Sequence, residues 1–112
     1  MPPVQELGFE VRDGALVVRV DLARLDAVAA PAFRDALLPA AAGRRKVVLD
    51  LDRVRFLDSS GVAALVSTLK KLEPGGQVRL VGAHDEVRQV LKLTRLEKVF
   101  PVDPSVEDAL RA

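Results

Sequence analysis

The chain has 112 residues, the length of a single domain, and its 49% apolar and 29% charged residues are ordinary for a folded protein. The net charge of +1 creates no strong field for nucleic acid or an anionic membrane, and the lack of cysteine excludes disulfides, thiolate metal sites and cysteine nucleophiles. The sequence begins without a secretory signal and has no window of ~20 apolar residues, so we expect a cytoplasmic protein without membrane insertion.

The first predicted element is a β-hairpin. Apolar residues alternate with polar or small ones over 7–11 and again over 16–22, which is the pattern of half-buried strands. Asp13-Gly14 lies between the two runs and supplies the positive φ angles that a tight turn requires.

A helix is predicted next, between Asp26 and Gly43. Pro31 is favoured in a first helical turn, and the apolar residues after it recur at helical spacing. Pro39 has no N–H to donate, so it should kink or end this helix.

Strands and helices alternate over the rest of the chain. A run rich in β-branched residues at 47–51 predicts a buried strand, and an apolar face over 62–72 predicts a helix. The later elements are a strand over 78–81, a helix over 87–93, a short strand at Val99-Phe100, and a terminal helix capped by Ser105 or Asp103. This order predicts an α/β fold of one domain spanning 1–112, with a mixed, mostly parallel sheet, an N-terminal hairpin and covering α-helices.

The run Asp58-Ser59-Ser60-Gly61 stands where a strand leads into the second long helix. A helix N-terminus offers unpaired N–H groups and a partial positive charge, so a hydroxyl there is exposed beside a position that tolerates phosphate. Gly61 permits close approach of another backbone. Asp and Ser are also the commonest N-cap residues, so these four residues taken alone favour plain helix capping.

Other motifs occur around this junction in a fixed order. They are Leu25-Asp26 followed by Ala30-Pro31, Val47 to Leu51 followed by Phe56 to Val62, Gly75-Gly76 before the strand at 78–80, and Leu93 to Leu96 before Val99-Phe100. In this combination the chain resembles the STAS-domain anti-sigma factor antagonist family over nearly its whole length.

The resemblance implies a non-enzymatic binding module, for which we expect no catalytic residue, metal or cofactor. Its unphosphorylated form would bind an anti-sigma factor, often a histidine-kinase-like serine kinase, and so release the sigma factor. The kinase would phosphorylate the serine directly after the signature Asp, which is Ser59 here, with Ser60 as the second choice. A phosphatase would reverse this step. The implied partner-binding residues are Asp26, Asp58, Ser59, Ser60 and Gly61.

Three motifs depart from the family pattern. Ala23 and Arg24 stand where Gly-Glu usually precedes the loop Asp, Ala63 replaces a second glycine, and Arg95 replaces a glycine before the late leucine. The first and third changes affect loop shape and partner choice, and none of them removes the serine.

Two other functions stay open. A STAS-type module that is never phosphorylated would serve as a scaffold or transporter-accessory subunit. A small metal-dependent phosphotransfer or hydrolase enzyme would use Asp50, Asp52 and Asp58, but no Lys or Thr is placed to assist them, so we expect solvent-facing carboxylates. His84 is expected to cap a helix or to be exposed, because no Gly-x-Ser-x-Gly elbow accompanies it.

Overall fold

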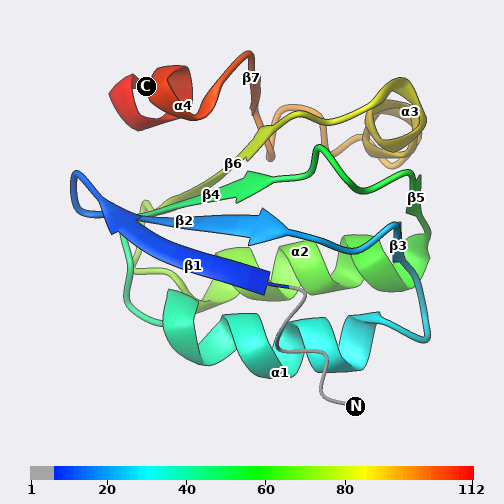
Figure 1. Ribbon diagram of the computed structural model, residues 1–112, viewed down its shortest axis with the longest axis horizontal. Coiled ribbons are helices and arrows are strands. Elements are labelled where there is room, and N and C mark those ends of the chain that lie inside the picture. Colours follow the sequence, from blue (N-terminus) through cyan, green and yellow to red (C-terminus); the bar gives the residue numbers. More distant parts are fainter. Residues whose placement is uncertain (1–6) are drawn as a thin grey trace.

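A mixed five-stranded sheet organises residues 7–112, the part of the chain that the computed structural model describes (Figure 1). Its strand order is β1-β2-β4-β6-β7, and β3 and β5 form a separate two-stranded parallel sheet. Only β1 and β2 pair antiparallel, which confirms the predicted α/β fold with a mostly parallel sheet. The elements are β1 (Leu7–Arg12), β2 (Ala15–Val20), β3 (Arg24–Leu25), α1 (Ala30–Ala41), β4 (Lys46–Asp50), β5 (Phe56–Leu57), α2 (Ser59–Lys71), β6 (Gln77–Val81), α3 (Asp85–Leu93), β7 (Val102–Asp103) and α4 (Val106–Arg111).

The predicted hairpin is confirmed. Asp13 and Gly14 have φ angles of 52° and 81°, as a two-residue turn between right-twisted strands requires. The second strand ends at Val20, two residues before the predicted end. Leu22 continues the alternation because its side chain packs on the core from the loop, without a ladder partner.

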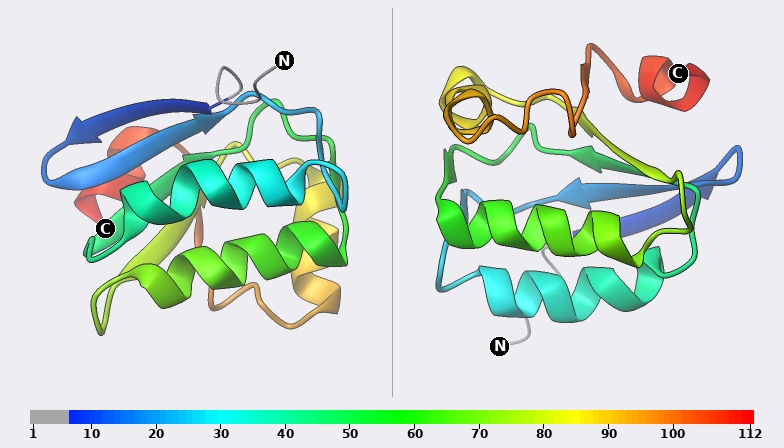
Figure 2. Two further views of the ribbon diagram at one scale, coloured as in Figure 1. Left: turned by 90° about the horizontal axis from the view of Figure 1, so that it is seen from below. Right: turned by 180° about the vertical axis from the view of Figure 1, so that it is seen from behind.

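Helices cover both faces of the sheet (Figures 1 and 2). α1 and α2 lie together on one face, and α3 adds Val87 and Leu91 to the same buried cluster. α4 lies on the opposite face, where Ala109 packs on Val17 and Val48 from the sheet. The core is therefore a thick layer on the α1–α2 side and a thin layer under α4.

Pro39 does not end α1, so that one of its two predicted effects is wrong, whereas the predicted stop at Gly43 is confirmed. Pro39 lies inside the helix, which continues to Ala41. Pro39 lies in the last turn on the exposed side of α1, where its missing N–H removes a single helical hydrogen bond. Gly43 follows the helix with a φ of 76°, in the left-handed region that stops helices.

The predicted strand at Val99-Phe100 is also wrong. These residues form a turn in which the N–H groups of Val99 and Phe100 both donate to the Leu96 carbonyl, at 3.0 Å each. Phe100 is fully buried, so its hydrophobicity reflects a core position in a turn. The last strand is β7, which starts after Pro101. Arg95 opens this segment with a φ of 61°, a conformation that glycine adopts at lower cost.

Two polar contacts attach the C-terminal segment to the sheet. The Lys46 ammonium on β4 donates to the main-chain oxygens of Ala109, Leu110 and Ala112 at 2.7–3.2 Å, so a cation caps the C-terminal end of α4. Arg79 donates from Nε and Nη2 to the two carboxylate oxygens of Asp103 at 2.6 and 2.9 Å. Of the two predicted caps of α4, Ser105 is the one observed, because its hydroxyl accepts from the Asp108 N–H. Asp103 forms the ion pair with Arg79 instead.

The Arg79–Asp103 pair should make stability depend on pH in the acid range. Hydrogen bonds from Arg79 lower the pKa of Asp103 below 3.8, so its stabilisation is complete above that value and is lost as the pH falls through the folded-state pKa. We expect wild type to exceed Asp103→Asn in free energy of unfolding at pH 7, and the difference to shrink below about pH 4. Urea unfolding at several pH values measures this difference, and a difference that does not change with pH would contradict the assignment.

Candidate functional site

The candidate site is built on a short pairing that the sequence did not reveal. β3 and β5 pair in parallel with Arg24 opposite Phe56 and Leu25 opposite Leu57. Asp26 and Asp58 directly follow the two leucines, so the pairing brings them to adjacent positions at one end of the molecule (Figure 1). Each strand has only two residues, which is too short to produce a detectable alternation.

Asp58 caps α2. Its backbone is extended, and its Oδ1 accepts from the N–H groups of Ser60 at 2.9 Å and Gly61 at 3.1 Å. The carboxylate thus satisfies two of the four free N–H groups at the start of the helix and lies at the positive end of its dipole. The helix capping that the sequence favoured for Asp58 is therefore confirmed.

The two serines differ in exposure. Ser59 is the first residue of α2 and is exposed, whereas Ser60 is half-buried. The hydroxyl that follows the capping Asp58 is therefore within reach of an external enzyme or protein surface.

Gly61 has no room for a side chain. A Cβ at this position would lie 2.3 Å from the carbonyl oxygen of Leu25 and 2.5 Å from Cδ1 of Leu57. The first turn of α2 therefore contacts the backbone of β3 directly, as predicted for this glycine. This contact fixes Ser59 relative to the loop that carries Asp26.

Asp26 organises the loop between β3 and α1. Its Oδ1 accepts from the N–H groups of Val28 and Ala29, both at 3.1 Å, and its Oδ2 accepts from Arg24 at 3.2 Å. The Ala29 N–H, followed by Arg24, lowers the pKa of the Asp26 carboxyl, so it is an anion at neutral pH. The Arg24 guanidinium lies 4.0 Å from the centroid of the Phe56 ring and so ties the loop to β5.

The cap makes a stability prediction. We expect Asp58→Ala to lower the free energy of unfolding by about 1 kcal/mol, because two N–H groups lose their acceptor. Asp58→Asn should lose less, since its amide oxygen can accept the same bonds. Chemical denaturation of the three proteins measures the difference, and equal stability of wild type and Asp58→Ala would contradict the assigned cap.

Asp50, Asp52 and His84, the other polar residues considered from the sequence, form hydrogen bonds with their own neighbours. Asp50 accepts from the Asp52 N–H at 3.1 Å, and His84 Nε2 lies 2.6 Å from the Asp52 carbonyl oxygen. His84 precedes α3 without a side-chain cap bond. Within residues 7–112 no group of three or more His, Asp or Glu side chains is placed to hold a metal ion. No helix in the same range is long and apolar enough to cross a membrane.

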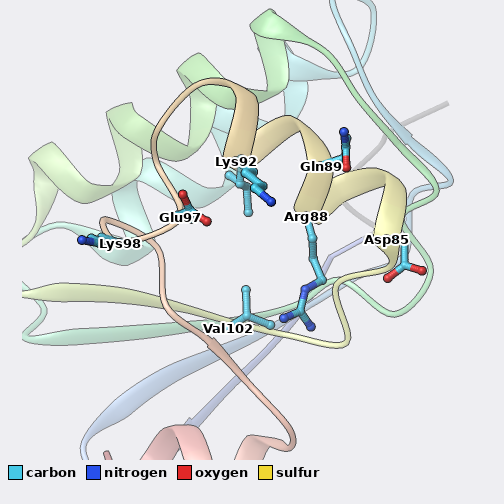
Figure 3. A pocket seen from close by; sticks show the side chains of 8 residues that line it. Asp85, Arg88, Gln89, Lys92, Glu97, Lys98 and Val102 are labelled. Carbon is cyan, nitrogen blue, oxygen red and sulfur yellow. The ribbon is translucent and has the colours of Figure 1, made fainter.

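A hollow of about 620 Å³ lies beside α3 and does not include the serines (Figure 3). Arg88 and Lys92 project into it from one face of α3, and Glu97 and Val102 line it from the following segment. It is separate from the residues that the sequence singled out.

Comparisons with known proteins relate this chain to one family. A family model described as the STAS domain matches residues 7–109. The anti-sigma-B factor antagonist of Staphylococcus aureus is 27% identical over 104 residues, covering 92% of this chain and 90% of the relative. An anti-sigma factor antagonist from Mycobacterium paratuberculosis has a crystal structure with a TM-score of 0.81 and 34% identity, covering 94% of this chain and 90% of that chain. A STAS domain protein from Planctomyces limnophilus has the same fold, with a TM-score of 0.83 at 24% identity and 94% coverage of both chains. The chain therefore belongs to the STAS domain family.

Proposed function

We propose that this protein is an anti-sigma factor antagonist whose binding is controlled by phosphorylation of Ser59. The unphosphorylated chain binds an anti-sigma factor in the cytoplasm and so frees a sigma factor. A serine kinase phosphorylates Ser59, and the phosphorylated chain dissociates from the anti-sigma factor. This kinase is the anti-sigma factor itself or a separate protein. A phosphatase restores the binding form. The chain performs no chemistry itself.

The exposed Ser59 hydroxyl at the start of α2 carries this proposal. Asp58 directly precedes it, Asp26 follows the strand that pairs with β5, and hydrogen bonds from backbone N–H groups hold both carboxylates in place. A partner that fits a neutral hydroxyl between these carboxylates meets about two extra negative charges after phosphorylation. The names of the relatives from Staphylococcus aureus and Mycobacterium paratuberculosis support an anti-sigma factor as that partner.

The binding surface includes the residues around the serine. Gly61 keeps the first turn of α2 against Leu25, and Asp26 shapes the loop beside it. Ser60 is half-buried, so it serves as a contact at the edge of this surface and is a poorer kinase substrate than Ser59. We therefore assign Ser59 as the modified residue.

The test uses the purified chain and the anti-sigma factors of its own host. Each one is titrated against the chain, and each one with kinase activity is incubated with the chain, ATP and Mg²⁺. We expect one of them to bind the unmodified chain and mass spectrometry to find a single phosphate, on Ser59. Ser60→Ala should accept the phosphate, and Ser59→Ala should not. Binding that no phosphate affects would instead indicate a constitutive scaffold and would overturn the switch.

A further inference from the structure

The free edge of β1 is a surface that the proposed function does not use. β1 is an outer strand of the five-stranded sheet, and no strand within residues 7–112 pairs with its far edge. Natural sheet edges are shielded by short strands, by proline, by charged side chains such as lysine, or by bulges. The other outer strand, β7, has two residues, whereas β1 has six and runs without a bulge against β2. β1 contains neither proline nor lysine, and its charged residues are Glu10 and Arg12, whose Oε2 and Nε atoms lie 3.9 Å apart.

One face of β1 is apolar and uncovered. Phe9 and Val11 are 43% and 58% exposed, although they lie opposite the buried Val18 and Leu16 of β2, on the face of the sheet that α1 and α2 cover. Figure 2 (left) shows β1 at the margin of the sheet, extending beyond α1. The helix that buries the neighbouring strands therefore leaves these two side chains in water.

The opposite face of β1 carries a hollow with an unmatched charge. Gly8, Phe9, Glu10, Val17 and Arg19 line a cavity of about 250 Å³ at this edge. The Arg19 side chain lies over Gly8, because its Nη2 is 3.6 Å and its Cζ 3.9 Å from the position that a Cβ on Gly8 would take. No acidic side chain within residues 7–112 forms an ion pair with Arg19.

The hairpin determines which backbone groups face outward. In a hairpin closed by a two-residue turn, the residues that flank the turn exchange both of their hydrogen bonds. Arg12 therefore points its N–H and C=O groups at β2, and by alternation Glu10 and Gly8 do the same. The residues between them, Phe9 and Val11, present their backbone groups at the free edge, as Leu7 does at the strand's start.

An antiparallel strand centred on Phe9 matches all of these features at once. In that register Phe9 lies opposite its own copy and Leu7 lies opposite Val11, so every outward-facing residue of β1 is paired and the apolar side chains meet on one face. Glu10 of the second copy lies opposite Gly8, beside the guanidinium of Arg19. No like charges lie opposite each other within the strand.

We propose that two copies of this chain associate through β1, which pairs antiparallel with β1 of the second copy in the register centred on Phe9. The two five-stranded sheets become one continuous sheet. The α1–α2 layer of each copy lies on the same face of this sheet. The twofold axis runs perpendicular to the sheet, midway between the two Phe9 residues, and Glu10 of each copy pairs with Arg19 of the other. The serine site is no part of this contact, so the proposal stands apart from the switch.

Disulfide formation tests the register, because the chain contains no cysteine. Directly opposed residues of a hydrogen-bonded antiparallel pair have Cα atoms about 5.5 Å apart, within the range of a disulfide. The expected result is that Phe9→Cys forms a covalent dimer under mild oxidation and that Val11→Cys, about 13 Å from its counterpart, stays monomeric. Crosslinking of Val11→Cys but not of Phe9→Cys would overturn the register, and crosslinking of neither variant would overturn the pairing.

Charge reversal tests the predicted ion pairs without a covalent bond. By light scattering, the wild-type mass should rise toward twice that of one chain as the concentration increases. Glu10→Arg and Arg19→Glu should each raise the dimer dissociation constant by about tenfold, since two symmetric pairs become repulsive. The double variant should restore dimerisation, and Ser59→Ala should dimerise as wild type does. A wild-type chain that stays monomeric, or a double variant as weak as the single ones, would refute the contact.

Discussion

Phosphorylation of Ser59 is expected to weaken binding of the anti-sigma factor by about a thousandfold, while the fold persists. The partner would have to bury an unpaired dianion next to two fixed carboxylates, which costs about 4 kcal/mol of binding free energy. The fold tolerates the same charge because phosphate on Ser59 lies at the positive end of α2 in solvent. Isothermal titration of the two forms measures the affinity, and thermal unfolding measures the stability.

Variants at the two serines separate charge from shape. Ser59→Ala should bind as tightly as the unmodified chain, whereas Ser59→Asp should bind more weakly but less weakly than the phosphorylated form, because it adds one charge instead of two. Ser60→Asp is the matched control, one residue further into α2, and should have the smaller effect. Equal affinity of the unmodified and phosphorylated chains would contradict the electrostatic switch.

Gly61→Ala is expected to destabilise the protein by about 3 kcal/mol, although alanine normally stabilises a helix. The new methyl group would lie 2.3 Å from the Leu25 carbonyl oxygen, and an oxygen fixed in a strand cannot rotate away. Relief requires α2 to separate from β3, which breaks the junction that presents Ser59. Urea unfolding measures the loss of stability.

Ala63→Gly provides the matched control two residues further along the same helix. Ala63 is exposed, so replacing it should cost about 1 kcal/mol from helix propensity alone. The two substitutions are chemically opposite, yet both should destabilise, which only the close contact at Gly61 explains. A Gly61→Ala variant as stable as wild type would show that the contact relaxes freely.

The sequence determined the main elements because their signals are local. Alternation and the Asp-Gly turn specified the hairpin, and helical spacing of apolar residues specified α1, α2 and α3. Local chemistry also singled out the start of α2, since an aspartate, two hydroxyls and a glycine before an apolar face are typical of a capped helix. The pattern failed at Val99-Phe100 because burial in a turn and burial in a strand require the same apolar residues.

The tertiary structure decided how these pieces combine into a site. Pairing of Leu25 with Leu57 joins two segments that are 32 positions apart, and no local pattern encodes a pairing of two residues per strand. That pairing brings Asp26 beside Asp58 and gives Gly61 its steric role, because the carbonyl of Leu25 occupies the space where its Cβ would be. The exposure of Ser59 and of the β1 edge follows likewise from which helices cover which strands. Coverage depends on long-range packing, so it is a property of the folded chain and not of any segment alone.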